Sequence, residues 1–246
     1  MLKLGYETDN HNRKIKKGRE RSVNIGYRIV KEFHRPPQSL IQGFAKIPVP
    51  NIGDSMNRTA AVSSALRPYN QARLLGPAYT VRVPAGDNLL FYYAIDQAMP
   101  GDIIVVDGGG FKERALCGEI MVDLAIARGL GGFVVDGAIR DAMELAGKDF
   151  PVFARCASPN GPYKNGPGEV NVPVNIGGRV IEPGDILIGD GNGLVAVKPD
   201  EAEEVLEKAR AVIEKESHMM ESIHEKKCLD LAWMYEKIEK DQCSVI

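Results

Sequence analysis

The stretch GGFVVDGAIRD, from Gly131 to Asp141, joins a buried strand to a charged end. Phe133, Val134 and Val135 form a short apolar run after two glycines, which indicates a strand inside the protein core. The stretch ends on Arg140 and Asp141. The simpler interpretation of this ending is a surface ion pair at a loop. The alternative is an arginine that binds substrate beside a carboxylate that binds a metal ion.

Strands and helices alternate around this stretch. The pattern predicts strands at Ala78–Val83 and Ile103–Asp107, and helices at Asn88–Ala98, Glu119–Arg128 and Asp141–Ala146. Such alternation is typical of a parallel sheet with crossover helices. After Val152 the sequence is mostly β, in the segments 152–155, 169–176, 178–181, 185–190 and 193–197. We therefore predict an α/β fold, a layered β/β/α domain with a partly parallel sheet.

Both ends of the chain are predicted to add helices to this domain. At the N-terminal end we expect a helix from Ser22 through Val30, a second over Gln38–Ile47 and a third over Asp54–Leu66. At the C-terminal end, a helix begins after Pro199 and continues to about Ile238. The predicted division is residues 1–50 for a basic arm with a helical extension, 51–198 for the β/β/α domain and 199–246 for the C-terminal helix.

The C-terminal helix is longer than the domain to which it belongs. Its first turns are acidic, as the helix dipole favours, and an apolar stripe follows. Long periodic segments are unusual in compact domains. We therefore expect much of this helix to pack on a neighbouring subunit, the alternative being a helix that lies wholly on its own sheet.

The composition excludes several classes of protein. The 246 residues are 44% hydrophobic and 26% charged, and the net charge of −2 gives no overall attraction to nucleic acid. The basic segment from Lys14 to Arg21 lacks interleaved aromatic residues, so we expect a solvated arm. No apolar run suits a signal peptide or a membrane span, and we expect a cytoplasmic protein. The cysteines form no CxxC pair and the histidines no HxH pair, which disfavours a zinc site.

The loop CGEIM, from Cys117 to Met121, opens the helix that precedes the quoted stretch. Free backbone N–H groups and the positive end of the helix dipole meet at such a terminus, which suits a carboxylate or phosphate. Gly118 allows a ligand to approach the backbone closely. The alternative is an ordinary helix start, with Gly118 as the N-cap and Glu119 interacting with the dipole.

The loop DGAIRD, from Asp136 to Asp141, follows the next strand. Arg140 offers a planar fork that matches a carboxylate, and Asp141 offers the hard oxygen that Mg²⁺ or Mn²⁺ prefers. In a βαβ unit, the loop before the helix and the loop after the second strand lie at the same edge of the sheet, where ligands bind. We therefore predict that the two loops face one pocket.

The segment Gly118–Glu144, GEIMVDLAIARGLGGFVVDGAIRDAME, resembles the defining segment of the class II pyruvate aldolases. These enzymes cleave 4-hydroxy-4-methyl-2-oxoglutarate and 4-carboxy-4-hydroxy-2-oxoadipate. The same fold family includes the regulator of ribonuclease activity A, RraA, and members once labelled as dimethylmenaquinone methyltransferases. The resemblance covers roughly residues 50 to 215 and includes Phe153–Asn165 and Gly184–Val197. In its motif Arg-Asp-x-x-Asp/Glu, the last position is Glu144.

The resemblance implies a role for individual residues. The backbone amides of Gly118, Glu119, Ile120 and Met121 would hold the pyruvyl carboxylate, and Arg140 would bind the pyruvyl group and stabilise its enolate. Asp141 would bind Mg²⁺ or Mn²⁺ directly. Glu119 would reach the metal through water. An acidic residue from the C-terminal helix of the next subunit would close the site, with Glu216 as our candidate and Glu214 as its competitor.

The resemblance also implies the reaction and the assembly. We expect retro-aldol cleavage of a 4-hydroxy-2-oxo acid to pyruvate, oxaloacetate decarboxylation as a side activity, and a trimer or hexamer with sites between subunits. Asp87 and Asn88 lie in a segment similar to the family's loop near the pocket. A Schiff-base lysine stays open, because Lys112 and Lys164 are near in sequence. The alternatives are a binding protein that regulates a ribonuclease and a lyase acting on another hydroxy acid.

Overall fold

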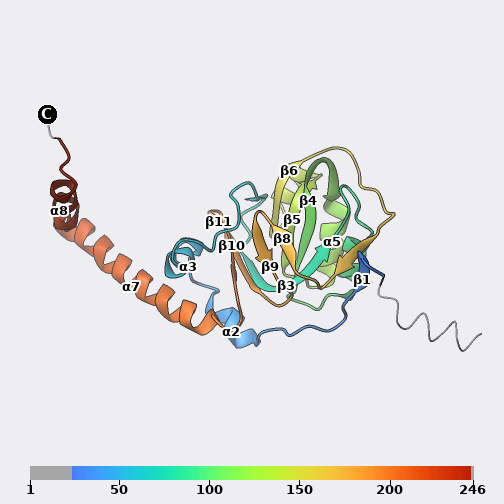
Figure 1. The fold of residues 1–246 in the computed structure, drawn as a ribbon, viewed down its shortest axis with the longest axis horizontal. Coiled ribbons are helices and arrows are strands. Elements are labelled where there is room, and N and C mark those ends of the chain that lie inside the picture. The colour runs from blue at the N-terminus through green and yellow to red at the C-terminus, as the bar shows by residue number, and fades with distance from the viewer. Residues whose placement is uncertain (1–23, 245–246) are drawn as a thin grey trace, which may run out of the picture.

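The computed structural model describes residues 24–244, and a mixed sheet lies at its centre (Figure 1). The strand order is β1–β7–β3–β4–β5–β6–β2, and the four strands from β3 to β6 run parallel to their neighbours in that series. The bounds are β1 Tyr27–Ile29, β7 Gly168–Val170, β3 Leu74–Arg82, β4 Ile103–Cys117, β5 Gly132–Ile139, β6 Val152–Ala157 and β2 Arg67–Pro68. The prediction of an α/β fold with a partly parallel sheet is confirmed.

Strand β5, which contains most of the quoted stretch, is buried along its whole length. The side chains of β5 alternate between the two faces of the sheet, as the two-residue period of a strand requires. Phe133 and Val135 face helices α4 (Leu89–Gln97) and α5 (Glu119–Ala127), whereas Val134 packs in the cluster on the other face. The short helix α6 (Ala142–Ala146) follows β5 directly. A strand covered on both faces explains the unbroken apolar run at its start.

A second β layer covers the face of the sheet opposite α4 and α5. Strand β10 (Ile186–Asp190) pairs antiparallel with both β3 and β11 (Gly193–Val197), and β8 (Val174–Ile176) forms a hairpin with β9 (Arg179–Ile181). Helices α2 (Gln38–Gly43) and α3 (Val49–Ser55) pack on β10 and β11 through Ile41, Phe44 and Ile52. The predicted layering of two β layers and helices is therefore present, with helices on the outer side as well.

The C-terminal helices extend away from the body of the molecule (Figure 1). In α7 (Ala202–Lys226), the buried residues are all in the first turns, from Ala202 to Ala209. The predicted continuous helix to about Ile238 is wrong at one point, because Lys227 adopts a left-handed conformation (φ 55°) that ends α7. The separate helix α8 (Ala232–Lys240) has no buried residue. Within residues 24–244, no helix is long and apolar enough to cross a membrane.

Three N-terminal predictions differ from the structure. The expected helix from Ser22 is wrong in the part that can be checked, because Tyr27–Ile29 forms β1 and pairs with β7; Ser22 and the basic arm lie outside the described residues. The helix expected at Gln38–Ile47 ends at Gly43. The helix expected at Asp54–Leu66 is wrong, because α3 ends at Ser55 and Val62 N donates a hydrogen bond to Leu194 O, at the edge of the second β layer.

Candidate active site

The two loops predicted to face one pocket meet at the ends of β4 and β5. Cys117 and Ile139, the last residues of these strands, are paired in register, and Arg140 N donates a hydrogen bond to Cys117 O at 2.9 Å. One residue further, Glu119 N donates to Asp141 Oδ2, also at 2.9 Å. The carboxylate of Asp141 thus accepts a hydrogen bond from the first turn of α5. The backbone confirms the predicted convergence of the two loops.

Asp141 adopts a left-handed conformation, with φ 56° and ψ 40°. Asp and Asn tolerate this region better than other side chains, although it is uncommon outside glycine. The turn places the Asp141 carboxylate over the start of α5, and Oδ2 lies 3.6 Å from Arg140 Nε. Both side chains stay accessible, with 41% of Arg140 and 36% of Asp141 exposed. We call this pair open, because its contact is long and both charged groups are accessible to a ligand; in a closed ion pair the two groups are in close contact.

Gly118 is required by the closeness of these two side chains. Its backbone is extended (φ −158°), so the reason is space rather than conformation. A Cβ atom at this position would lie 2.8 Å from Arg140 Cγ and would collide with Asp141 Oδ2. Any larger residue must therefore displace the arginine, the aspartate or both.

The start of α5 offers fewer free amides than the four named by the resemblance. Glu119 N is bonded to Asp141, and Met121 N is bonded to Gly118 O at 3.1 Å. Within the described part of the chain, the amides of Gly118 and Ile120 have no hydrogen-bond partner. These two donors remain for an anion at the positive end of the helix.

A small cavity of about 150 Å³ lies in front of these loops. Its lining residues come from four parts of the chain and are Asn88, Tyr92, Cys117, Gly118, Ile120, Met121, Arg140, Gly161, Pro162 and Lys164. Burial, and to a smaller extent the nearby Asp141 carboxylate, raises the pKa of the Cys117 thiol, so this group stays protonated and is no base. Two of the lining residues, Arg140 and Lys164, are cationic, so the cavity places two positive charges in one small space.

The segment from Gly161 to Gly166 forms the wall that carries Lys164. Buried Asp87 anchors it by accepting hydrogen bonds from Asn165 N and Gly166 N, at 2.5 and 3.0 Å. The Nζ atom of Lys164 lies 5.9 Å from the centre of the Tyr92 ring. In the sequence, Lys164 was a candidate only because it lies near the motif along the chain, and no pattern pointed to Tyr92.

Glu119 and Glu144, the other acidic residues of the predicted motif region, do not line the cavity that contains Arg140. The Glu119 carboxylate contacts Lys148, with Oε1 3.1 Å from Nζ. The hydrogen bond to Asp123 is the main cause that raises the pKa of Lys148, and the hydrogen bond to Glu119 raises it further. Glu144 lies exposed in the first turn of α6. In residues 24–244, no group of three or more Asp, Glu, His or Cys side chains is arranged to hold a metal ion.

Glu216 lies on α7, where it contacts its own chain. Its Oε2 accepts a hydrogen bond from Asn51 Nδ2 of α3 at 2.6 Å. Glu214, the competing candidate, lines a different hollow together with His218 and Leu229. Neither glutamate lines the cavity that contains Arg140.

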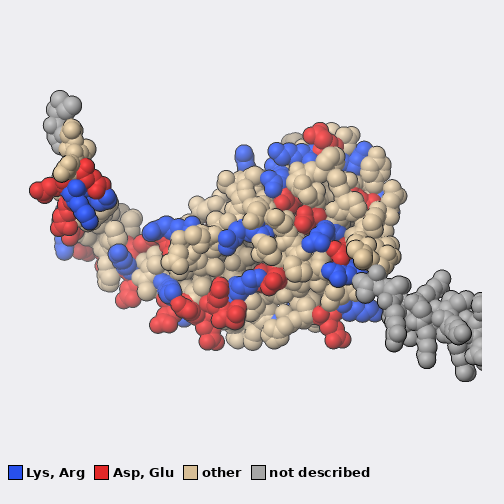
Figure 2. Space-filling view, in the orientation of Figure 1, with Lys and Arg blue, Asp and Glu red and all other residues tan. Residues whose placement is uncertain are grey.

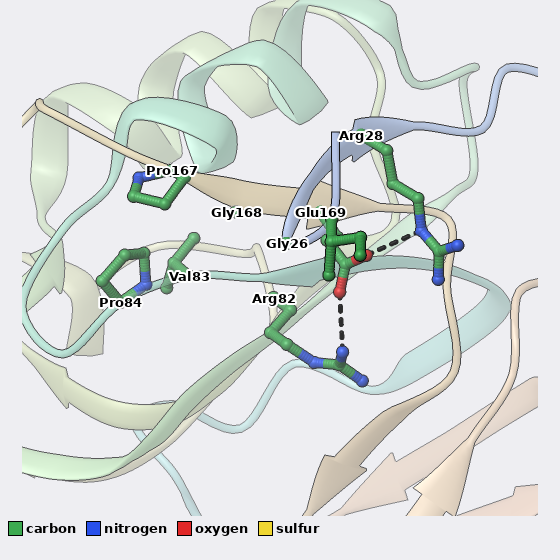
Figure 3. Close-up of a pocket in the computed structure, with 9 residues that line it drawn as sticks. Gly26, Arg28, Arg82, Val83, Pro84, Pro167, Gly168 and Glu169 are labelled. Atoms are coloured by element: carbon green, nitrogen blue, oxygen red, sulfur yellow. Dashed lines mark hydrogen bonds and ion pairs between the residues drawn. The ribbon is translucent and has the colours of Figure 1, made fainter. Parts of the chain in front are cut away.

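A larger cavity of about 590 Å³ lies between β1, β3 and β7 (Figure 3). Its charged side chains are paired with one another: Arg28 Nε lies 2.6 Å from Glu169 Oε1, and Arg82 Nη1 lies 2.7 Å from Glu169 Oε2. Figure 3 shows the two arginines reaching Glu169 from opposite sides. Glu169 thus fastens β1 to the sheet and holds both guanidiniums in close ion pairs, whereas Arg140 has only the 3.6 Å contact to Asp141, so the smaller cavity is the better candidate.

Comparison with known proteins agrees with the resemblance in the sequence. The model of the family described as "RraA-like: Aldolase/RraA" matches residues 49–196. A protein of Halalkalibacterium halodurans named "Putative 4-hydroxy-4-methyl-2-oxoglutarate aldolase" is 39% identical over 171 residues, which are 69% of this chain and 81% of that protein.

Solved structures of similar proteins share the fold. An uncharacterized protein from Pseudomonas syringae pv. tomato str. DC3000 is 28% identical with a TM-score of 0.70, covering 78% of this chain and 95% of that chain. The RNA-processing inhibitor RraA from Thermus thermophilis is 31% identical with a TM-score of 0.58, covering 62% of this chain and 93% of that chain. The chain therefore belongs to the Aldolase/RraA family.

Proposed function

We propose that this protein is a divalent-metal-dependent aldolase that cleaves a 4-hydroxy-2-oxo acid, of the 4-hydroxy-4-methyl-2-oxoglutarate type, to pyruvate. Oxaloacetate decarboxylation is the proposed side activity. The observation that carries the proposal is the open pair of Arg140 and Asp141 at the start of α5, in front of a cavity of about 150 Å³. The name of the Halalkalibacterium relative supports the same substrate class.

The pyruvyl end of the substrate is proposed to bind between Arg140 and the first turn of α5. The Arg140 guanidinium, 41% exposed, can form two hydrogen bonds with a carboxylate or with a carboxylate and the adjacent keto oxygen. The amides of Gly118 and Ile120 supply further donors at the positive end of the helix. Lys164 supplies a second positive charge in the same cavity, which suits a substrate with two carboxylates.

The residues present fit a Mg²⁺ or Mn²⁺ ion that keeps most of its water ligands. Such ions are commonly held by one or two carboxylates, with water and substrate oxygens completing the coordination. Asp141 is the proposed direct ligand, and Glu119 is the proposed ligand through water, since its backbone is bonded to Asp141. When bound there, the ion supplies Lewis-acid polarisation of the 2-keto oxygen.

The cleavage removes the proton of the 4-hydroxyl and breaks the bond between C3 and C4. The bonding electron pair passes to the pyruvyl part as an enolate, C4 becomes a carbonyl carbon, and the enolate takes a proton at C3. One molecule of 4-hydroxy-4-methyl-2-oxoglutarate thus gives two molecules of pyruvate. Arg140 provides fixed positive charge where the enolate charge develops. Loss of CO₂ from oxaloacetate forms the same enolate without removing a hydroxyl proton.

The proposed assembly is a homotrimer or homohexamer in which the C-terminal helix packs on a neighbouring subunit. The support is the apolar surface of this arm, which its own chain leaves uncovered: Met220 is 52% exposed, and Trp233 and Tyr235 are each 65% exposed. Ile120, which lines the cavity, is 71% exposed, and Met143 of α6 is 87% exposed. Exposed large apolar side chains mark protein–protein contacts where they join into one surface. Glu216 remains the proposed acidic residue that this helix brings to the next subunit's site.

The alternative function is regulation of a ribonuclease by binding. It is favoured by one specific observation, the 31% identity to the RNA-processing inhibitor RraA. Figure 2 shows positive and negative side chains interspersed over one face of the molecule, so this face offers no single-sign surface for RNA. A regulator of this type would use such a mixed face to contact a protein.

The experiment that tests the proposal measures pyruvate release from 4-hydroxy-4-methyl-2-oxoglutarate and from oxaloacetate with coupled lactate dehydrogenase. It uses Mg²⁺, Mn²⁺ or excess EDTA, with the wild type and Asp141→Asn. Asn tolerates the left-handed conformation of residue 141 and can still accept the Glu119 hydrogen bond, so the variant removes mainly the charge.

Metal-dependent turnover that Asp141→Asn abolishes is the expected result. Turnover that persists in EDTA would point to a Schiff base, with Lys164 as the amine. An absence of turnover on both substrates with either metal would contradict the proposal and favour the regulator or another hydroxy acid.

A further inference from the structure

The segment Gly161–Gly166, which we call the Lys164 wall, carries Lys164 to the cavity and leads into β7. Asp87 holds this wall from the start of α4, through the amides of Asn165 and Gly166. Lys164 itself is an exposed residue, so the position of its ammonium group depends on the backbone that carries it. Loops keep their conformation through such contacts, and the wall has a second set of them at its other end.

Backbone pairing holds β7 more to β1 than to β3. The pairing with β3 includes two residues of β7, Glu169 and Val170, whereas the pairing with β1 includes these two and Gly168. Gly168 N donates to Gly26 O at 3.1 Å, and Arg28 of β1 forms its ion pair with Glu169. Figure 3 shows Gly26 and Arg28 beside Gly168 and Glu169. The point where the Lys164 wall joins the sheet is therefore fixed by β1.

Tyr27 of β1 also lies against the Lys164 wall. A Cβ atom added to Gly166 would lie 3.8 Å from Tyr27 Oη and 3.9 Å from Tyr27 Cε2, which is ordinary van der Waals contact. Tyr27 also lines a hollow of about 480 Å³ together with Leu89 and Tyr93 of α4. The end of the Tyr27 ring therefore covers the open side of Gly166, two residues after Lys164.

The segment that contains β1 is firmly attached to the domain. Arg35 donates two hydrogen bonds to the buried Asp102, at 2.9 and 2.7 Å, and Asn171 Nδ2 donates to Val30 O at 2.9 Å. Strand β1 precedes residue 49, where the match to the family model begins. This chain thus places a fixed strand from outside the matched region next to the wall of the candidate site.

We propose that Tyr27 is a positioning residue, which holds the Lys164 wall so that Lys164 meets the carboxylate on C5 of the substrate. This inference rests on the proposed function. The pyruvyl end of the substrate, C1 to C3, binds Arg140 and the start of α5, which β1 does not contact. Lys164 binds the part that leaves when the bond between C3 and C4 breaks. Strand β1 therefore acts on the recognition of the substrate's second half and not on the formation of the enolate.

Two reactions of one site separate this role from a general structural one. Cleavage of 4-hydroxy-4-methyl-2-oxoglutarate involves the C5 carboxylate, whereas deuterium exchange into the methyl group of pyruvate forms the same enolate without it. The readouts are the KM and kcat of cleavage and the rate of exchange at saturating pyruvate. All are measured on the full chain with Mg²⁺.

Tyr27→Ala should raise the KM for cleavage about fivefold, a size that coupling between neighbouring residues reaches, while kcat and the exchange rate change less than about twofold. Tyr27 is 44% exposed, so this variant should fold. Tyr27→Phe keeps the ring against Gly166 and should restore the wild-type KM. Ile29→Ala is the matched control, because Ile29 lies on the same strand, is 39% exposed and lines the same hollow, but the atoms nearest Gly166 belong to Leu89 and Tyr27.

Lys164→Met tests whether Tyr27 acts through the lysine. The methionine side chain is of similar length but carries no charge, so this variant should raise the KM for cleavage by more than Tyr27→Ala does. In the Lys164→Met background, Tyr27→Ala should raise the KM no further, since the effects of residues that act through one another are not additive.

The inference is overturned if Tyr27→Ala leaves the KM unchanged, lowers cleavage and exchange equally, or has its effect reproduced by Ile29→Ala. It is also overturned if Lys164→Met leaves the KM unchanged, or if the effects of Tyr27→Ala and Lys164→Met multiply in the double variant. A wild type that neither cleaves 4-hydroxy-4-methyl-2-oxoglutarate nor exchanges pyruvate would instead refute the proposed function. An active wild type with any of the former results would refute only this inference.

Discussion

Strand β5 delivers two aspartates, Asp136 and Asp141, and each lies beside an arginine. Asp136 is 4% exposed, pairs with both Nε and Nη2 of Arg155, and accepts a hydrogen bond from Gly177 N at 2.8 Å. Asp141 is open, with its Oδ2 3.6 Å from Arg140 Nε. Five residues apart, the same two charges make a closed pair and an open one.

The difference teaches how to separate structure from function in an Arg–Asp pair. The Asp136 pair links β5, β6 and the β8–β9 hairpin, and its hydrogen bonds use up both carboxylate oxygens. Among residues 24–244, the Arg140 guanidinium makes only the long contact to Asp141. A charge that the fold leaves unpaired beside a cavity is available to a ligand, and perturbed or unpaired charges gather at functional sites.

The largest effect is expected for Arg140→Ala. Removing a fixed positive charge from the developing enolate should lower kcat by about 10²–10³-fold. Thermal unfolding should be nearly unchanged, because the arginine is 41% exposed and its contact to Asp141 is long, at 3.6 Å. Arg155→Ala is the control, and it should lower the melting temperature more than kcat. The reverse pattern would break the distinction between the two pairs.

Gly118→Ala is expected to have the next largest effect. The added Cβ cannot fit between Arg140 and Asp141 without moving them, and misplacement of catalytic groups by about 1 Å can cost about 10²-fold in rate. Gly53→Ala, on α3, is the control, because a Cβ at Gly53 meets no atom within 4 Å. Steady-state kinetics on oxaloacetate would show the loss, and full activity in Gly118→Ala would mean that the two side chains need not lie where the structure has them.

Asp136→Asn should give the smallest effect, and on stability rather than on catalysis. The neutral amide loses the charge-assisted part of the Arg155 hydrogen bonds, which should lower the free energy of unfolding by about 2 kcal/mol. Urea denaturation measures this loss. Asp141→Asn, the same substitution five residues on, should change stability by less than about 1 kcal/mol. If the two variants were equally unstable, Asp141 would have to be a structural residue like Asp136.

The sequence predicted the centre of the fold because that part follows local rules. The apolar run from Phe133 to Val135 lies in β5, and the helix after Gly118 is α5 within one residue of its expected end. Parallel topology then requires that their loops share an edge, so Arg140 and Asp141 could be placed beside Gly118 before the structure was known.

The errors lie where distant partners decide the local structure. Tyr27–Ile29 forms a strand because Gly168–Val170 offers it an edge, a partner some 140 residues away that no local pattern reveals. The segment after Ser55 leaves the helix at Asn57 and Arg58, both with positive φ, and pairs near Leu194. Lys164 reaches the cavity because Asp87, at the start of α4, ties down the Gly161–Gly166 segment by accepting hydrogen bonds from Asn165 N and Gly166 N.

The most direct test of the central claim asks whether the Arg140–Asp141 loop forms a pyruvate enolate, whatever the second half of the substrate is. Pyruvate is incubated with the protein in D₂O, and loss of the methyl proton signal is followed by NMR with Mg²⁺ and with EDTA. The account predicts metal-dependent exchange in the wild type and none above background in Asp141→Asn. No exchange in the wild type, or equal exchange in the variant, would contradict it.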